Sequence, residues 1–452
     1  MKEPNKLTRR HFLGNAVAGM TVLSIGGILP GFSAKSYNRI AGANETIRVS
    51  MMGVNSRGNA LAQTFAEQTN CDVLHVCDVD SRAIDKCRKM LEGVQQGIQT
   101  KAFGDFRKSL ESKHIDAMVI AAPDHWHAPA ALLAIQAGKH VYVEKPCSHN
   151  PNEGEILEKA SVRYGKTIQM GNQRRSYPNV IKGIQELKDG VSGRVYFGKG
   201  WYTNNRQSIG IGKEVAVPEW LDWNLWQGPA PRRAFKDNIV HYNWHWFWHW
   251  GTGEALNNGT HMVDLLRWGM GVDFPIRVSS NGGRFFCKDD WETPDTQVIS
   301  LDFKEGVSMT WEGRSCNGRY IEGSSVGVTF YGEKGSMFMD GGNGYTIYSL
   351  DNKVIKEVKP TQNIDARNLA NPSGNLDGIH VQNFFDNIYG RGELHSDIHS
   401  GHRSTLLVQL GNIAQRVGHS LETDPVNGHI LNDKEAQKLW SRSYETGWEM
   451  KL

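Results

Sequence analysis

The sequence predicts an α/β protein whose first domain is built on a doubly wound parallel sheet. Short β-branched runs at 47–52, 73–76, 117–121, 140–143 and 167–170 alternate with helical segments. Strands separated by single helices pair in parallel through right-handed crossovers. Ligands in such folds bind at the carboxyl ends of the strands. We therefore expect the chemistry of this chain just after residues 52, 76, 121 and 143.

Composition excludes several classes of protein. The chain has 452 residues, enough for two or three domains. With 39% hydrophobic and 22% charged residues it is typical of a globular rather than a disordered protein. A net charge of +3 is small for a nucleic-acid binder, so we expect no such partner. The six cysteines form no Cys-x-x-Cys pair and no zinc-ligand spacing, and we expect free thiols.

A basic segment precedes the first strand and is typical of an export signal. Residues 1–10 carry four basic side chains against one acid, and an apolar, glycine-rich stretch follows at 16–29. The pair Arg9-Arg10 within 8–13 resembles the twin-arginine signal, which is read by a translocase that moves folded proteins. We expect 1–43 to be a twin-arginine signal peptide cleaved after Ala43, no membrane anchor, and a periplasmic or otherwise exported location. An uncleaved anchor, or a tail with a chance arginine pair, is the alternative.

A glycine-rich turn follows the first strand and leads into an apolar helix. Gly53 and Gly58 fill the outer places of a dinucleotide-binding fingerprint, and Asn55 stands in the middle place. Glycine permits the tight turn, the approach of the pyrophosphate and close packing of the helix, whose N-terminus then meets the phosphates. Asp78 ends the second strand 25 residues after Gly53, where an acid can accept the ribose hydroxyls. The pattern predicts a Rossmann domain that binds NAD, with NADP not excluded; Asp78 as a merely solvated strand end is the alternative.

Polar residues also follow the later strands. The strand at 140–143 leads into Glu144-Lys145-Pro146, where proline fixes φ and ends the strand, so that the lysine is held over the cofactor site. The residues expected to bind the cofactor are Gly53, Asn55, Ser56, Arg57, Gly58, Asp78, Pro123, His125, His127, Glu144 and Lys145.

With these motifs the sequence resembles the Gfo/Idh/MocA family of nicotinamide-dependent sugar and cyclitol oxidoreductases. The resemblance covers nearly all of 44–452. It implies a Rossmann domain at 44–171 and an α+β domain at 172–452 with an open, mostly antiparallel sheet, against which the substrate faces the nicotinamide. We expect C-terminal helices to pack back on the Rossmann domain, and the open sheet to support a homo-oligomer.

The second family signature spans 251–264. Offsets of four and seven predict that Asn257, His261 and Asp264 share one helical face. Asn257 occupies the position at which the family carries a carboxylate. An amide can hold a substrate hydroxyl, but it cannot take a proton or offset a lysine charge.

Oxidation of a sugar hydroxyl requires a hydride to leave carbon while a base takes the hydroxyl proton. Histidine suits that proton step, and a lysine near the nicotinamide would stabilise the developing alkoxide. We expect His261 as the base, Lys145 as its electrostatic partner and Asn257 as a positioning residue. A structural helix histidine is the alternative for His261.

The run at 241–250 is the most aromatic part of the chain. Its tryptophans would share one face of a strand, whereas His241, His245 and His249 would share one face of a helix. An aromatic core or subunit interface, a carbohydrate platform that includes Trp248, and a metal site are the open interpretations. The family needs no metal, and we expect none.

Two arginines follow the strand predicted at 167–170. Arg174 and Arg175 suit a polyol or a sugar carboxylate, or they pair with acids across the domain junction. The residues expected to bind substrate are Arg174, Arg175, Trp248 and Asp264.

The function that follows is hydride transfer between a sugar, glycoside or cyclitol hydroxyl carbon and tightly bound NAD(P). Free nicotinamide cofactor is scarce outside the cytoplasm, so an exported enzyme would have to be loaded before translocation and recycled by a second substrate. One alternative is an NAD-dependent glycosidase that acts by transient sugar oxidation and elimination. The other is a non-catalytic periplasmic sugar-binding protein with a structural cofactor.

Overall fold

A computed structural model describes residues 46–360 and 376–452. The predicted signal peptide lies outside these residues. The chain separates into two units at the boundary between Thr46 and Ile47, and Ile47–Leu452 form one compact unit. Among the described helices none is long and apolar enough to cross a membrane. All six cysteines have free thiols.

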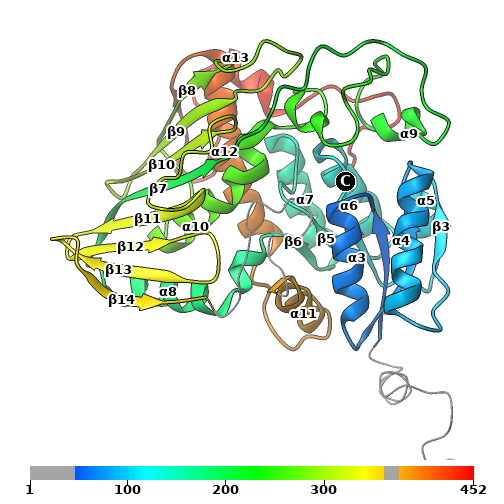
Figure 1. Cartoon of the computed structure of the whole chain (residues 1–452), viewed down its shortest axis with the longest axis horizontal. Helices are drawn as coiled ribbons and strands as arrows, with labels where there is room; N and C mark the ends of the chain where they lie inside the picture. The colour runs from blue at the N-terminus through cyan, green and yellow to red at the C-terminus, as the bar shows by residue number, and fades with distance from the viewer. Residues whose placement is uncertain (1–45, 361–375) are drawn as a thin grey trace, which may run out of the picture. The chain divides into compact units, whose positions relative to one another are not determined.

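Six parallel strands form the first sheet, in the order β3-β2-β1-β4-β5-β6 (Figure 1). They are β1 (Ile47–Met52), β2 (Cys71–Cys77), β3 (Lys101–Phe103), β4 (Ala117–Ile120), β5 (His140–Val143) and β6 (Ile168–Met170). The order reverses between β1 and β4, which opens a crevice at the carboxyl ends of these strands. The doubly wound fold is confirmed. Strand β3 was not predicted, because this three-residue edge strand is largely exposed and has no apolar run.

Helices connect the strands on both faces of the sheet: α3 (Arg57–Glu67), α4 (Ser81–Val94), α5 (Phe106–Leu110), α6 (Asp124–Gln136) and α7 (Pro151–Tyr164). Local signals start them, since Asp80 accepts a hydrogen bond from the Arg82 amide and Asn150 accepts one from the Glu153 amide. Helix α6 is buried on almost every side. Its Trp126 packs edge-on against Trp448 and donates to the Trp226 carbonyl at 2.9 Å.

The second sheet has nine strands in the order β14-β13-β12-β11-β7-β10-β9-β8-β15. Its neighbours pair antiparallel except β7 with β10, so the predicted open, mostly antiparallel sheet is confirmed. The strands are β7 (Val195–Thr203), β8 (Arg277–Gly283), β9 (Thr296–Phe303), β10 (Val307–Arg314), β11 (Val326–Gly332), β12 (Gly335–Met339), β13 (Tyr345–Ser349), β14 (Val354–Val358) and β15 (Leu421–Glu422).

Helices α8 (Pro178–Lys188), α10 (Thr260–Met270) and α12 (Ile398–Val417) pack against this sheet (Figure 1). Alternate strand residues such as Trp311 and Phe330 pack with Leu265 and Leu266 of α10 in one apolar core. Shorter helical segments are α9 (Trp223–Gln227), α13 (Lys434–Gln437), the 3₁₀ turns Gln173–Ser176, Asn243–Trp246 and Lys438–Trp440, and the π turn Ala255–Gly259.

Helices from the last third of the chain join the two sheets. Helix α12 packs on α7 and β6 as well as on α10 and β8. Helix α11 (Asp377–Ile388) packs on α3, and its Phe384 and Phe385 enter the same core as Phe65 and Tyr142 of the first domain. The core of the first domain is therefore completed by residues far along the chain.

Candidate active site

A cavity of about 410 Å³ runs along the carboxyl edge of the parallel sheet. Residues that follow each strand line it in spatial order: Asp78 after β2, Asn55 after β1, Pro123 after β4, Lys145 after β5 and Arg174 after β6. Neighbouring strands lie roughly 4.8 Å apart, so this row spans about 20 Å. The 241–245 and 257–261 segments of the second domain supply the facing wall.

The turn after β1 requires glycine at both outer positions. Gly53 has a φ of 79°, and a Cβ there would lie 2.7 Å from the Ala121 carbonyl oxygen. A Cβ on Gly58 would lie 1.6 Å from the Gly53 carbonyl oxygen, so Gly58 serves the packing of α3 on the turn. Asn55, Ser56 and Arg57 line the cavity, and Ser56 makes no side-chain capping bond. This helix end therefore suits a pyrophosphate.

Asp78 is positioned by two backbone amides. Its carboxylate accepts hydrogen bonds from the Val54 amide at 2.7 Å and the Asp80 amide at 3.0 Å, and burial raises its pKa. The acid therefore joins the glycine turn to the end of β2 and still lines the cavity. The residues present fit the nucleoside end of a dinucleotide, with the carboxylate placed for ribose hydroxyls.

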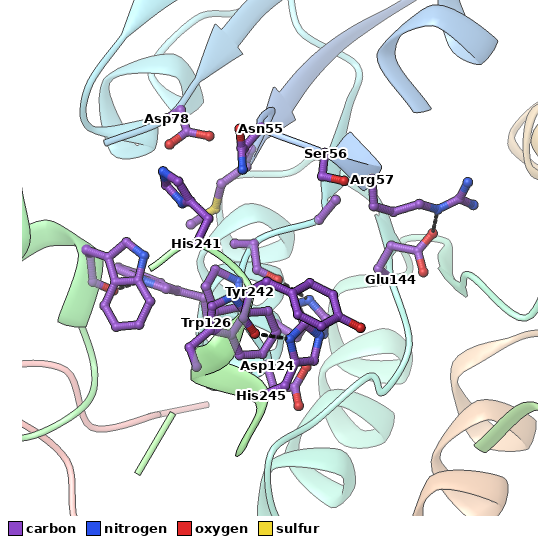
Figure 2. A pocket seen from close by; sticks show the side chains of 18 of the residues that line it. Asn55, Ser56, Arg57, Asp78, Asp124, Trp126, Glu144, His241, Tyr242 and His245 are labelled. Atoms are coloured by element: carbon purple, nitrogen blue, oxygen red, sulfur yellow. Dashed lines mark hydrogen bonds and ion pairs between the residues drawn. The ribbon is translucent and has the colours of Figure 1, made fainter. Parts of the chain in front are cut away.

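Second-domain residues cover this end of the cavity. Leu221 forms an antiparallel bridge with Asp80, and the Asp222 amide donates to the Val79 carbonyl at 3.0 Å. His241 Nε2 lies 2.7 Å from Asp80 Oδ2, and Figure 2 shows His241 beside Asp78. The Arg82 guanidinium lies 3.4 Å over the Trp220 ring. A bound dinucleotide would therefore be enclosed by both domains at this end.

Lys145 and Asn257 meet at the other end. Lys145 Nζ donates to the Asn257 carbonyl oxygen at 2.6 Å and to Asn257 Oδ1 at 3.0 Å. Burial lowers the pKa of Lys145, while the carboxylates of Glu144 and Asp124 act in the opposite direction. Asn257 belongs to the π turn that precedes α10, and both residues line the cavity. The structure thus brings Lys145 and Asn257 together.

His261 lies on the first turn of α10 and lines the same cavity. Burial lowers its pKa well below the ordinary value, and the nearby charges of Arg174 and Lys145 lower it further. Among the residues that the structure describes, none hydrogen-bonds its Nδ1. A neutral imidazole with unmet bonding capacity can accept a proton from a ligand at neutral pH.

A buried ion pair supports Asn257 from behind. Arg206 Nε donates to Glu254 Oε2 at 2.6 Å, and Glu254 Oε1 accepts from Asn258 Nδ2 at 2.5 Å and Asn257 Nδ2 at 3.4 Å. The Arg206 guanidinium lies 4.9 Å from the Trp246 ring centroid. A chain of polar contacts therefore runs from Arg206 through Glu254 and Asn257 to Lys145. Neither Arg206 nor Glu254 was among the predicted site residues.

Three predicted substrate residues lie elsewhere. Arg175 donates to both carboxylate oxygens of Asp264 at 2.7 Å, and Ser404 donates to Asp264 at 2.6 Å. Trp248 lies under the Arg416 guanidinium at 5.1 Å. In the described part of the chain, these three residues are not in the cavity lining. The Arg175–Asp264 pair matches the alternative in which the arginine meets an acid, and Asp264 does not share a cavity-facing surface with Asn257 and His261.

Two predicted cofactor residues have structural partners. His125 Nε2 lies 3.0 Å from the Trp226 carbonyl, and its Nδ1 lies 3.3 Å from the Trp250 carbonyl. Among the described residues that line the cavity, His125 does not occur. His127 does line the cavity, but both ring nitrogens face carbonyls, of Pro146 at 2.6 Å and Ala122 at 2.7 Å. His127 thus ties the segment after β4 to the segment after β5. Glu144 bonds Arg57 Nε at 2.9 Å (Figure 2).

The aromatic run at 241–250 forms a 3₁₀ turn, Asn243–Trp246, within irregular chain. Both regular geometries considered for it, strand and helix, are therefore wrong. Trp246 stacks on Trp291 with centroids 4.0 Å apart, and Trp250 packs edge-on against Trp223 and Trp226. Trp246, Phe247 and Trp250 are buried, so this part of the run is aromatic core.

The three histidines of this run have separate partners, which are Asp80, the Tyr242 carbonyl and the Pro231 carbonyl. Within 46–360 and 376–452, no group of three metal-ligating side chains is close enough to hold a metal ion.

Tyr242 and His245 are cavity residues that sequence reasoning missed. The Tyr242 hydroxyl lies 3.5 Å from Asn257 Nδ2, and His245 Nδ1 lies 2.6 Å from the Tyr242 carbonyl. Both line the cavity. Tyr242 has a φ of 89°, which is unusual for a residue with a side chain. No local sequence pattern signals this conformation, so the composition of the run was the only available clue.

Comparison with known proteins agrees with this geometry. The model described as "Oxidoreductase family, NAD-binding Rossmann fold" matches residues 47–172, and that described as "Oxidoreductase family, C-terminal alpha/beta domain" matches 214–423. A glycosyl hydrolase family 109 protein of Saccharopolyspora erythraea is 27% identical over 230 residues, 48% of this chain and 50% of the relative. An alpha-N-acetylgalactosaminidase of Shewanella oneidensis is 24% identical over 213 residues, 44% of this chain and 46% of the relative. The chain thus spans about half the length of the curated relatives it matches.

Solved structures are similar over most of the chain. The WlbA dehydrogenase from Bordetella pertussis, in complex with NADH and UDP-GlcNAcA, has a TM-score of 0.62 at 19% identity, covering 84% of this chain and 99% of that one. A levoglucosan dehydrogenase in complex with NADH and levoglucosan has a TM-score of 0.62 at 16% identity, covering 83% and 99%. At these identities the likeness shows the fold alone. With both family models matched in order along it, the chain belongs to the Gfo/Idh/MocA family of NAD-binding oxidoreductases.

Proposed function

We propose that this protein oxidises a hydroxyl-bearing carbon of a sugar, glycoside or cyclitol by hydride transfer to NAD(P). The observation that carries the proposal is the placement of Lys145, Asn257 and His261 in one cavity with the glycine turn and Asp78. Bound nicotinamide would supply the hydride acceptor. The geometry supports NAD over NADP, because the Asp78 carboxylate in the cavity lining would repel a phosphate on the ribose.

Each residue has a task in this reaction. The N-terminus of α3 and Asp78 bind the cofactor. The tight turn that contains Gly53 and Gly58 sets the distance between the cofactor and the parallel sheet. Lys145 Nζ, held by Asn257, donates a hydrogen bond to the substrate oxygen and stabilises negative charge there. Neutral His261 takes the hydroxyl proton as the carbon–hydrogen bond breaks.

His261→Ala tests the assignment. We expect substrate-dependent nicotinamide reduction to be lost while cofactor content, measured after denaturation, stays at the wild-type level. The matched control is His419→Ala, which removes an exposed histidine bonded to Asp433. Turnover that survives in His261→Ala would remove this residue from the role of base. Substrate-driven reduction in the wild-type protein would also dismiss the non-catalytic sugar-binding alternative.

A second candidate function is NAD-dependent glycoside cleavage, in which the sugar is oxidised transiently, the aglycone is eliminated, water adds to the anomeric carbon and the hydride returns to the sugar. Its support is the likeness to glycosyl hydrolase family 109 proteins, one of which is named an alpha-N-acetylgalactosaminidase. Chromogenic glycosides, with N-acetylgalactosaminides among them, separate the two. Release of the chromophore without net nicotinamide reduction indicates the glycosidase. An accumulating keto-sugar indicates the oxidoreductase.

The proposal includes export and a tightly held cofactor. Export is supported by the Arg9-Arg10 signal, and retention by the contacts of Leu221 and His241 over the β2 end of the cavity. The cofactor would be loaded before translocation and recycled in place. Mass spectrometry of the purified protein tests retention directly, since stoichiometric NAD supports it and an empty protein counts against it. Size-exclusion chromatography with light scattering tests the proposed homo-oligomer.

A further inference from the structure

Arg174 is a buried cation without a carboxylate partner among the described residues. Its side chain lines the cavity, the residue is only 4% exposed, and its Nε donates to the Gly341 carbonyl at 2.7 Å. In the described part of the chain nothing hydrogen-bonds its Nη1. Five other largely buried arginines each bond a carboxylate, namely Arg57, Arg175, Arg206, Arg267 and Arg442.

An uncompensated guanidinium is costly to bury, because desolvation of a charge is repaid only by a partner of opposite charge. Burial lowers the pKa of Arg174, which the more distant carboxylates of Asp377 and Asp340 only partly offset. A ligand that brings an anionic group would compensate the charge and give the unpaired, buried Nη1 an acceptor.

The cofactor phosphates do not account for Arg174. Strand β6 is separated from β1 by β4 and β5, so Arg174 lies about 14 Å along the sheet edge from the glycine turn. The pyrophosphate belongs at that turn and at the N-terminus of α3. Arg174 instead lies on the far side of Lys145, where the substrate would be.

The lining at this end of the cavity contains uncharged polar side chains as well as charged ones. Gln173, Asn257, Asn258 and neutral His261 line the same end of the cavity, and the amide nitrogen of Gln173 can donate to an anion. Glu144 is already paired with Arg57. Asp124 also lines the cavity, where it accepts a hydrogen bond from Thr252 and offsets the charge of Lys145. Among the described residues, Arg174 is therefore a cation at this end that no carboxylate bonds.

We propose that the substrate of this enzyme is a sugar that carries an anionic group, a carboxylate or a sulfate, bound by Arg174 Nη1 with Gln173 beside it. This inference rests on the proposed function and names its substrate class. Arg174 is then a specificity-determining residue, and its neighbour Arg175 is not, because Arg175 is already bonded to Asp264.

The experiment compares matched sugars on the purified holoenzyme. Methyl glycosides in the gluco and galacto series are offered as the neutral sugar, the uronate and the 6-sulfate, with nicotinamide reduction as the activity readout. Calorimetry measures binding of the same compounds. The variants are Arg174→Gln and Arg174→Lys, with Arg194→Gln as a control that removes an exposed arginine paired with Glu333. Cofactor content and the unfolding midpoint verify that each variant is folded.

In the wild-type protein, kcat/KM should be higher for an anionic sugar than for the matched neutral sugar. Comparison of kcat/KM for the uronate and the 6-sulfate then identifies which anionic group the site binds. Loss of a charge-assisted hydrogen bond is equivalent to about a 10- to 100-fold change, so the ratio of anionic to neutral kcat/KM should fall by that factor in Arg174→Gln. Arg174→Lys should keep part of the preference, and Arg194→Gln all of it.

Two results overturn the inference while leaving the proposed function in place. One is a wild-type preference for neutral sugars, and the other is an equal loss on anionic and neutral sugars in Arg174→Gln, which indicates a purely structural arginine. If no sugar is turned over but a uronate or sulfate binds in an Arg174-dependent way, the anion site is supported and the oxidoreductase proposal fails. If the protein shows no turnover of any sugar and no Arg174-dependent binding, both the inference and the proposed function are overturned.

Discussion

Replacement of Arg206 by methionine should damage both stability and catalysis. Methionine keeps most of the apolar volume beside Trp246 but removes the guanidinium that bonds both carboxylate oxygens of Glu254, at 2.6 and 3.3 Å. The Glu254 side chain is only 3% exposed, so its charge would remain buried without a cation. Asn257 and Asn258 both donate to this carboxylate and depend on its position.

The magnitude follows from that burial. Removal of one partner of a buried ion pair costs about 3–5 kcal/mol of folding free energy, because the other charge is left uncompensated. The exposed Arg194–Glu333 pair, with side chains 57% and 55% exposed, sets the comparison. Arg194→Met should change the free energy of unfolding by at most about 1 kcal/mol, since exposed pairs contribute little. Glu254→Gln, which keeps the shape and loses the charge, should cost a similar amount to Arg206→Met, because it leaves the Arg206 guanidinium buried without an anion.

Denaturant unfolding followed by tryptophan fluorescence measures these differences, and steady-state kinetics measure the catalytic part. We expect kcat of folded Arg206→Met to fall at least about tenfold, because Lys145 loses a fixed partner when Asn257 moves. Cofactor content should not change, since Arg206 is not a lining residue within the described chain. A loss of less than about 1 kcal/mol in Arg206→Met, or an unchanged kcat, would refute the reasoning about this pair.

Three further predictions concern the cofactor, pH and export. Asp78→Asn should weaken NAD binding and reduce the discrimination against NADP, because the carboxylate held by the Val54 and Asp80 amides is lost. Fluorescence titration of the apoprotein with NAD and with NADP measures both affinities. Unchanged selectivity between the two cofactors would argue against the role of Asp78. Burial lowers the pKa of His380 to about 4 and of His402 to about 3, so below pH 6.5 the unfolded chain binds protons that the folded chain does not. The free energy of unfolding should therefore fall by about 2 kcal/mol per histidine between pH 6.5 and 5, and His402→Gln should show a smaller loss in urea titrations at the two pH values. Changing both Arg9 and Arg10 to lysine should leave the protein in the cytoplasmic fraction of expressing cells, and unaltered export would contradict the twin-arginine interpretation.

Local patterns were sufficient for every strand of the first sheet except the short edge strand β3. The strands at Ile47–Met52 and His140–Val143 are β-branched runs bounded by turn residues, and their ends in the structure match the sequence prediction. Gly53 and Gly58 could be identified because backbone geometry restricts those positions to glycine. Such features depend on neighbours in sequence, and the sequence displays them directly.

The facing wall could not be predicted in the same way. Arg206 and Glu254 are 48 residues apart, and their pairing depends on how the irregular chain between them folds. The offsets that grouped Asp264 with Asn257 and His261 assumed one continuous α-helix, whereas a π turn at Ala255–Gly259 precedes α10. Trp248 was grouped with its aromatic neighbours, but turns direct each of these rings toward a different contact. Position along the sequence does not encode those directions.

The packing of α11 and α12 has a consequence for modularity. Phe384 and Phe385 complete the core around Phe65 and Tyr142, and Ile398 does the same for the core that contains Met170. A fragment that stops after β6 would expose these apolar faces, so we expect that the nucleotide-binding domain does not fold stably on its own. The ribosome adds more than two hundred residues after β6 before α11 and α12, which complete the core of this domain, have been synthesised. A chain interrupted between the two sheets should therefore be recognised by chaperones and proteases as unfinished, although its dinucleotide fingerprint is complete.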